Sequence, residues 1–170
     1  MENSELKYNK LDRLIISIGR KICIFYIVCF IIICYEVFSR YVLNSPTSWV
    51  QETTTLIAGI LFIWGGLHSL TTDRHIKITI LYDMLTKKYK YYVDILISTL
   101  LIICLVFMNY SAFLLFKSSW FKPWGAFYME TSGSAWNPPF PAISKLVLFV
   151  VLILMLIQVL VKFISILRRK

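Results

Sequence analysis

The run ILISTLLIICLVFMNYSAFLLF, residues 95–116, carries no charged side chain over its 22 residues. A helix that spans the hydrocarbon core of a bilayer needs roughly 20 mainly apolar residues, so this run predicts a membrane-spanning helix. Three other segments, residues 22–43, 49–71 and 143–166, are also long and mainly apolar, although each contains one or two charged residues. We therefore predict an all-α integral membrane protein, with four transmembrane helices in a single transmembrane domain over residues 1–170.

The composition excludes other classes of protein. The chain has 170 residues, of which 58% are apolar and only 16% are charged. In a soluble domain about a quarter of the residues are normally charged, and a chain of this size has too little interior to hide so much apolar surface. Disordered chains are excluded as well, because they are poor in apolar residues. We expect membrane lipids to surround the protein.

The basic residues predict the orientation of the four spans. The net charge is +9, from 18 Lys and Arg against 9 Asp and Glu. Such an excess in a soluble chain would suggest nucleic acid, but 14 of these 18 residues lie in the N-terminal tail, in the linker after the second span or at the C-terminal end. Cytoplasmic segments carry such an excess of Lys and Arg. We predict a cytoplasmic N-terminus and C-terminus, and no nucleic-acid partner.

The linker after the second span has the pattern of an amphipathic helix over residues 76–90. Its apolar residues recur at helical spacing, and lysines take much of the remaining surface. Such a helix lies in the membrane interface, with its lysines near anionic headgroups. The stretch from Leu11 to Ile18 has a similar pattern and predicts a second interfacial helix. The predicted interface anchors are Lys77, Lys87, Lys88 and Lys90.

The linker between the last two spans, residues 117–141, faces outward in this topology and is rich in aromatic residues and proline. Aromatic rings at a membrane boundary commonly anchor it, which is one interpretation. The other interpretation rests on WNPPFP, residues 136–141, which prolines make stiff and non-helical. A rigid aromatic surface suits contact with another protein. The aromatic residues that would make this contact are Trp120, Trp124, Trp136 and Phe140.

Three charged residues lie where a membrane disfavours them. Glu36 and Arg40 are one helical turn apart on the first span, and Glu52 lies in the first turn of the second span, where the helix dipole favours a carboxylate. Because the linker between these spans is short, we expect Arg40 to lie close to both acids. The three residues would form a structural ion cluster or an anchor site for a partner. A proton relay is disfavoured, because no third titratable group continues the path further into the membrane.

Three larger polar side chains within the spans are candidates for contacts between helices. Asn109 and Gln158 are expected to form hydrogen bonds between helices. His68 lies about one turn from the predicted cytoplasmic end of the second span. It is interpreted as a packed, hydrogen-bonded side chain, with a ligand role as the alternative.

The sequence lacks the motifs of several functional classes. Haem b would need histidines on facing helices, and His68 and His75 are the only two histidines. No P-loop or metalloprotease motif occurs. The span centres are apolar, and the third span has none of the Gly or Pro interruptions expected in a carrier. We therefore expect no enzyme activity, no cofactor and no metal site, and we expect the chain to be a component of a larger assembly.

An ordered set of short motifs is specific enough to suggest a family. YEVFSRYVL, residues 35–43, is followed by Ser45-Pro46 and by WVQE, residues 49–52, and Gly65-Gly66 precedes DRHI, residues 73–76. These motifs, the aromatic third linker and the four-span plan resemble the DctQ-like family, the small membrane subunit of tripartite ATP-independent periplasmic (TRAP) transporters. The resemblance covers roughly residues 20–165.

The resemblance implies a small permease subunit in the bacterial inner (cytoplasmic) membrane. Such a subunit pairs with a large transmembrane subunit that moves substrate by a sodium-driven elevator motion. A periplasmic substrate-binding protein delivers the substrate, an organic acid of the C4-dicarboxylate or sialic acid type. The small subunit would act as a static scaffold and would help to dock the binding protein.

The resemblance also suggests roles for the residues singled out above. Contact with the large subunit is assigned to Glu36, Arg40, Trp49 and Glu52, and docking of the binding protein to the aromatic residues of the third linker. The alternative function is an independent small membrane carrier or channel. Substrate flux through the chain alone would identify that alternative.

Overall fold

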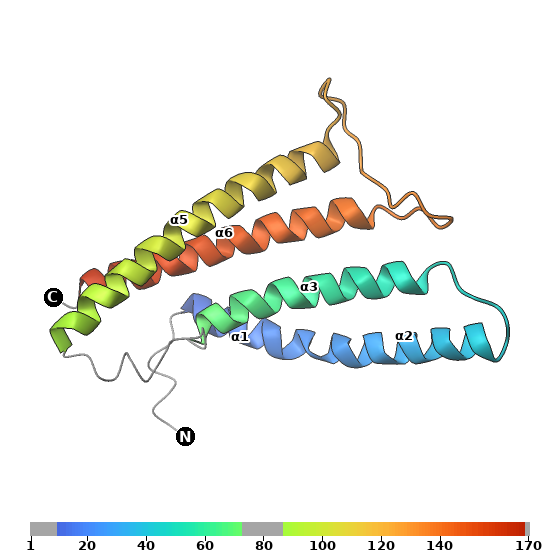
Figure 1. Cartoon of the computed structure of the whole chain (residues 1–170), viewed down its shortest axis with the longest axis horizontal. Coiled ribbons are helices and arrows are strands. Elements are labelled where there is room, and N and C mark those ends of the chain that lie inside the picture. Colours follow the sequence, from blue (N-terminus) through green and yellow to red (C-terminus); the bar gives the residue numbers. More distant parts are fainter. Residues whose placement is uncertain (1–9, 73–86, 169–170) are drawn as a thin grey trace.

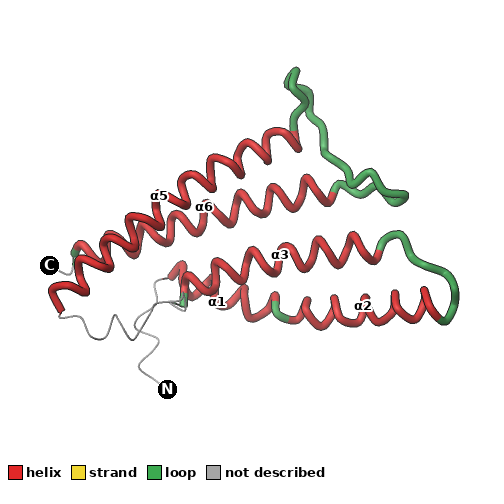
Figure 2. Tube along the Cα trace, viewed as in Figure 1, coloured by secondary structure: helices red, strands yellow, loops and turns green. Residues whose placement is uncertain are grey.

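The computed structural model of the chain describes residues 10–72 and 87–168, which form a bundle of helices (Figure 1). Within these residues the only β-type pairing is an isolated bridge between Phe121 and Phe127, and loops connect the helices (Figure 2). The helices are α1 (Lys10–Ile22), α2 (Ile24–Tyr41), α3 (Val50–Thr71), α5 (Lys87–Trp120) and α6 (Phe140–Leu167).

The described residues contain four helical stretches long and apolar enough to cross a membrane, which confirms the predicted fold class. Their bounds are Asp12–Tyr41, Val50–Thr71, Tyr89–Trp120 and Phe140–Leu167. α5 has 34 residues and extends beyond the charge-free run at both ends. A helix ends where its backbone is interrupted rather than where apolar residues stop, and Pro123 is the first proline after the run.

α1 and α2 form one nearly continuous stretch with a break at Cys23. The Tyr26 N–H donates to the Cys23 carbonyl at 3.1 Å, the spacing of a tight 3₁₀ turn rather than of an α-helix. The predicted amphipathic helix before the first span is present as α1. Its Ile15 is only 2% exposed and packs with Leu67 of α3 and Val151 of α6. The apolar face of α1 therefore contacts protein.

The order of helices across the bundle is α2, α3, α6, α5, with α1 against α3 (Figure 1). A second group of buried residues joins α3, α5 and α6 along their shared seams. The large apolar side chains of α2 and α5 are mostly exposed, as expected for surfaces that face lipid or another membrane protein. The residues of this second group are Leu70, Leu105, Ala112, Leu152 and Val159.

Two polar side chains link the helices, as the sequence predicts. The Gln158 amide nitrogen donates to the Asp12 carboxylate of α1 at 2.7 Å and to the Thr71 hydroxyl of α3 at 2.8 Å. Asn109 of α5 donates to the Leu152 carbonyl of α6 at 3.1 Å. Gln158 is 4% exposed, so one buried amide connects three helices at the same end of the bundle.

The bundle has two distinct ends (Figure 1). The α1 end contains α1 together with the final turns of α3 and α6. The loop end contains the linkers of residues 42–49 and 121–139. Lys77 and most of the predicted amphipathic segment 76–90 lie outside the described residues. Lys87, Lys88 and Lys90 of that segment belong to the first turn of α5, so the helix of the third span begins earlier than predicted.

Candidate functional site

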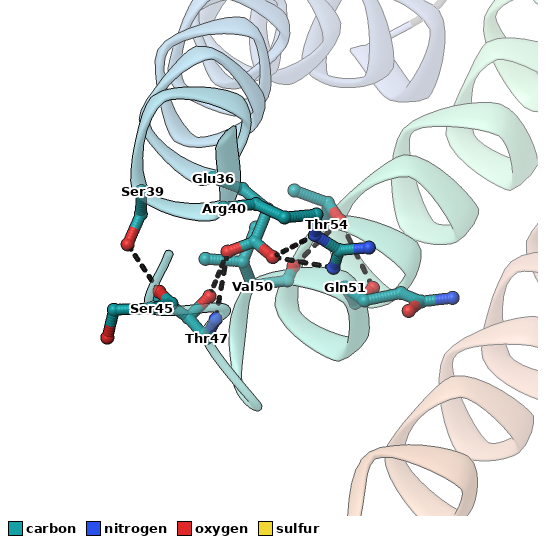
Figure 3. A network of polar contacts seen from close by, with 8 residues as sticks. All are labelled: Glu36, Ser39, Arg40, Ser45, Thr47, Val50, Gln51 and Thr54. Atoms are coloured by element: carbon teal, nitrogen blue, oxygen red, sulfur yellow. Dashed lines mark hydrogen bonds and ion pairs between the residues drawn. The ribbon is translucent and has the colours of Figure 1, made fainter. Parts of the chain in front are cut away.

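Polar contacts at the loop end centre on Glu36 in the last turns of α2 (Figure 3). Its Oε1 accepts from Arg40 Nη2 at 2.6 Å and from Arg40 Nε at 3.1 Å. Its Oε2 accepts from the backbone N–H of Thr47 at 3.3 Å and also from the Thr47 hydroxyl. The Glu36 carboxylate therefore connects the end of α2 to the linker that leads into α3.

The burial of this pair is unequal. The Glu36 side chain is only 12% exposed, whereas Arg40 is 48% exposed. Ser39 donates to the Ser45 carbonyl at 2.6 Å and secures the same turn. Trp49 stacks on Tyr35, with ring centroids 6.2 Å apart. The motif residues of α2 and of the following linker thus form a closed hairpin end, and half of the Arg40 guanidinium side chain stays accessible.

Glu52 lies apart from this pair, which corrects the prediction that Arg40 would approach both acids. Arg40 bonds to Glu36, whereas Glu52 Oε1 accepts from the Ser132 hydroxyl of the outward linker at 3.1 Å. The physical reason is the rotation of α3, which turns its first acidic residue toward the α6 side of the hairpin. The predicted three-residue cluster therefore consists of the Glu36–Arg40 ion pair and a separate Glu52 carboxylate that bonds to the outward linker.

Glu52 borders a cavity of about 680 Å³ at the loop end, named here the loop-end crevice. Its walls come from the start of α3, the start of α6 and the linkers before each of them. Six of the twelve lining residues carry a hydroxyl group, and Glu52 is the only charged residue among the described residues that line it. The lining includes Thr47, Gln51, Thr55, Ser134, Phe140 and Ser144.

The predicted docking residues of the aromatic linker occupy different environments. Trp120 is the last residue of α5, is half-buried, and donates its indole N–H to the Ala142 carbonyl at 3.0 Å. Phe140 opens α6, lines the loop-end crevice, and meets Trp136 edge to face at 5.2 Å. Trp124 is 74% exposed at the far tip of the linker. Trp120 thus fastens two helices, while Trp124 and Trp136 present accessible aromatic surface.

The match to a family model extends over nearly all of this architecture. The model described as "Tripartite ATP-independent periplasmic transporters, DctQ component" matches residues 29–169, which include most of α2 and all of α3, α5 and α6. The chain belongs to this family. No curated protein matches the chain significantly.

Membership of the DctQ family establishes the general role of the molecule. The chain is the small permease component of a TRAP transporter, a membrane protein that works with other parts of a tripartite system. The family is one of transporter components rather than of enzymes. The motif residues that suggested the DctQ family lie mainly in the α2–α3 hairpin. Gly65 and Gly66 of the second motif face open space, because an added Cβ would meet no described atom within 4 Å.

A close helix contact in this DctQ-family chain occurs at a different glycine. An added Cβ at Gly19 of α1 would lie 3.2 Å from the His68 ring nitrogen Nδ1 and 3.4 Å from the Trp64 indole nitrogen. Gly19 thereby allows α1 to approach α3 closely. His68 is a packed side chain, as predicted, but its buried Nδ1 has no hydrogen-bond partner among residues 10–72 and 87–168.

Glu130, which was not predicted from the sequence as a functional residue, holds the aromatic linker against the bundle. Its carboxylate accepts from the Ser119 hydroxyl of α5 at 2.6 Å and pairs with the Lys145 ammonium of α6. Its backbone N–H also donates to the Ser119 carbonyl at 2.9 Å. The hydrogen bond from Lys145, followed by that from Ser119, lowers the pKa of Glu130 below its ordinary value, against a smaller opposing effect of burial. The only sequence signal was an acid in the linker and a base early in the fourth span.

Acidification is expected to release the linker. Because the pKa of Glu130 is lower in the folded protein than in the unfolded chain, its stabilising contribution is present above about pH 4.3 and is lost as the pH falls through the lowered folded value. Tryptophan fluorescence of the reconstituted chain, titrated from pH 7 to pH 3, should report this release. Glu130→Gln should remove the acid transition, and an unchanged titration in this variant would contradict the assignment.

Proposed function

We propose that the chain is the static small subunit of a sodium-driven transporter for organic acids of the C4-dicarboxylate or sialic acid type. In this proposal it braces a large elevator subunit in the bacterial inner membrane and helps to dock the periplasmic binding protein. Its N-terminus and C-terminus lie in the cytoplasm, so the loop end faces the periplasm. The DctQ family match supports the transporter context, and the distribution of basic residues supports the orientation.

Hydrogen bonds between helices, made by polar side chains within the described spans, support the scaffold role. The Gln158 amide and the Asn109 amide nitrogen are engaged in hydrogen bonds between helices, whereas Asn109 Oδ1 and His68 Nδ1 are buried without a partner among the described residues. A polar substrate that crosses a protein interior needs unengaged polar groups near the midplane. Because the amides of the spans join helices and the unpartnered atoms are buried in the packed bundle, the chain is suited to hold a wall in place while another subunit moves.

The α2–α3 hairpin is the proposed contact with the large subunit. α2 exposes most of its apolar side chains, and its Arg40 side chain remains about half accessible. A neighbouring membrane helix would cover this apolar surface and would contact the charged Arg40 side chain near the loop end of α2. Lys77, Lys87, Lys88 and Lys90 are proposed to keep the scaffold at the cytoplasmic interface through anionic headgroups.

Flux measurements in liposomes test this function. Vesicles that contain only this chain should accumulate no organic acid under an inward sodium gradient, with or without the binding protein. Vesicles with the chain, its large subunit and the binding protein should accumulate the acid, and vesicles without the chain should lose at least about tenfold in rate. Accumulation by the chain alone would instead identify an independent carrier or channel.

A further inference from the structure

One oxygen of the Glu52 carboxylate is in an unusual state. Oε1 accepts from Ser132, but Oε2 is buried from solvent and has no hydrogen-bond partner within residues 10–72 and 87–168. A carboxylate oxygen without water and without a donor is energetically unfavourable. Such groups in native proteins call for a specific explanation. A donor from outside this chain would supply one once rotation of the Glu52 side chain turns Oε2 toward it.

The loop-end crevice around Glu52 indicates the chemistry of that donor. Its volume of about 680 Å³ is far larger than the roughly 30 Å³ that a water molecule occupies. The hydroxyls of Thr55 and Ser144 donate to carbonyls of their own helices and keep lone pairs that can accept hydrogen bonds. The only formal charge in the described lining is negative. A group with a positive charge and several N–H donors, attached to a larger body, matches this lining.

The position of the crevice indicates where that group comes from. The walls include linker residues 47–48 and 132–135, so the crevice lies among the loops rather than within the apolar belt. A lipid chain in the crevice would leave the Glu52 carboxylate and the hydroxyl groups without polar partners. Phe140 lines the crevice and Trp136, which is 45% exposed, packs on Phe140. An aromatic anchor beside a charged recess is typical of a protein interface.

We propose that the loop-end crevice receives one Lys or Arg side chain of the periplasmic binding protein, with Glu52 as its counter-ion. This inference rests on the proposed function, which places the loop end in the periplasm. Under this inference Glu52, which was predicted to contact the large subunit, belongs instead to the docking surface for the soluble partner. Trp136 and Phe140 supply the adjacent apolar contact, and Ser132 holds the carboxylate in position.

Binding measurements on the intact complex test the inference. The chain and its large subunit are reconstituted together in nanodiscs, and the purified binding protein of the same transporter is titrated onto them. Glu52→Gln keeps the size of the side chain and removes its charge, so docking should weaken about tenfold, mainly through faster dissociation. The salt dependence of docking between 50 and 500 mM NaCl should also become shallower. Asp94→Asn, at the opposite end of the bundle, is the matched control and should dock like the parent chain.

A charge exchange identifies the partner residue. Glu52→Lys should reduce docking more than Glu52→Gln does, and reversal of one surface Lys or Arg of the binding protein to Glu should restore it. Parent-like affinity and salt dependence in Glu52→Gln would overturn the inference. So would a loss of large subunit from the Glu52→Gln complex with unchanged docking, because the occupant would then be the large subunit. If the parent complex neither docks the binding protein nor takes up acid, the proposed function fails instead.

Discussion

Arg40→Glu is expected to reduce the amount of large subunit that co-purifies with this chain by about tenfold. In the native hairpin the Arg40 guanidinium binds Glu36 through two nitrogens, and Glu36 in turn binds Thr47. The substitution places two carboxylates one turn apart on α2, which repel each other. It also reverses the charge that the hairpin presents to its neighbour. Both changes act on the surface proposed to contact the large subunit.

Two further variants separate these effects. Arg40→Lys keeps the charge but loses the planar two-nitrogen contact, so its co-purification should be intermediate. Lys117→Glu makes the same change of charge on α5, away from the α2–α3 hairpin, and should leave the large subunit bound. Thermal unfolding of each variant without the large subunit reports damage to the chain itself. Full recovery of the large subunit together with normal uptake in Arg40→Glu would exclude this contact.

Gln158→Leu is expected to lower the free energy of unfolding by about 1–3 kcal/mol. The buried Gln158 amide donates to Asp12 of α1 and to Thr71 of α3, so leucine removes two links between helices at once. The Asp12 carboxylate and the Thr71 hydroxyl each lose one hydrogen-bond partner inside the bundle. The loss should loosen α1 first, because α1 is the shortest of the described helices and contacts the bundle mainly through α3.

Unfolding in mixed micelles measures this effect, and two variants calibrate it. Thr71→Val removes only the hydroxyl and should cost about half as much, and the double variant should cost less than the sum because the two side chains bond to each other. Ile157→Leu, on an exposed position of α6, should change the free energy little. Equal stability of Gln158→Leu and Ile157→Leu would show that the polar contacts contribute nothing.

The sequence was sufficient for those parts of the fold that depend on local pattern. Four apolar runs of membrane length predicted four helices, because the bilayer fixes the length that a span requires. The spacing of Glu36 and Arg40 predicted their pairing, since residues four apart share a helical face. Asn109 and Gln158 were predicted to join helices because an unpaired amide inside a membrane is costly.

Features that depend on the rotation of helices or on the path of a loop were not predictable. Glu52 follows Arg40 closely in sequence, yet the rotation of α3 turns it toward Ser132 and away from Arg40. The pairing of Glu130 with Lys145 requires the outward linker to fold back on α6, which no periodicity encodes. The hydrogen bond from the Trp120 indole N–H to the Ala142 carbonyl likewise depends on how α5 and α6 are placed, and the docking role of Trp120 stays a prediction.

The pairing of successive helices in this bundle has a consequence for biosynthesis. α2 contacts α3 and α5 contacts α6, so each hairpin is complete once its second helix has left the ribosome. The contacts of α6 with α3 and with α1 must wait until α6 has been synthesised, because they join the two halves of the chain. The order of synthesis is therefore also an order of assembly, and the early hairpin with the proposed large-subunit surface is ready before the late one that carries the aromatic linker.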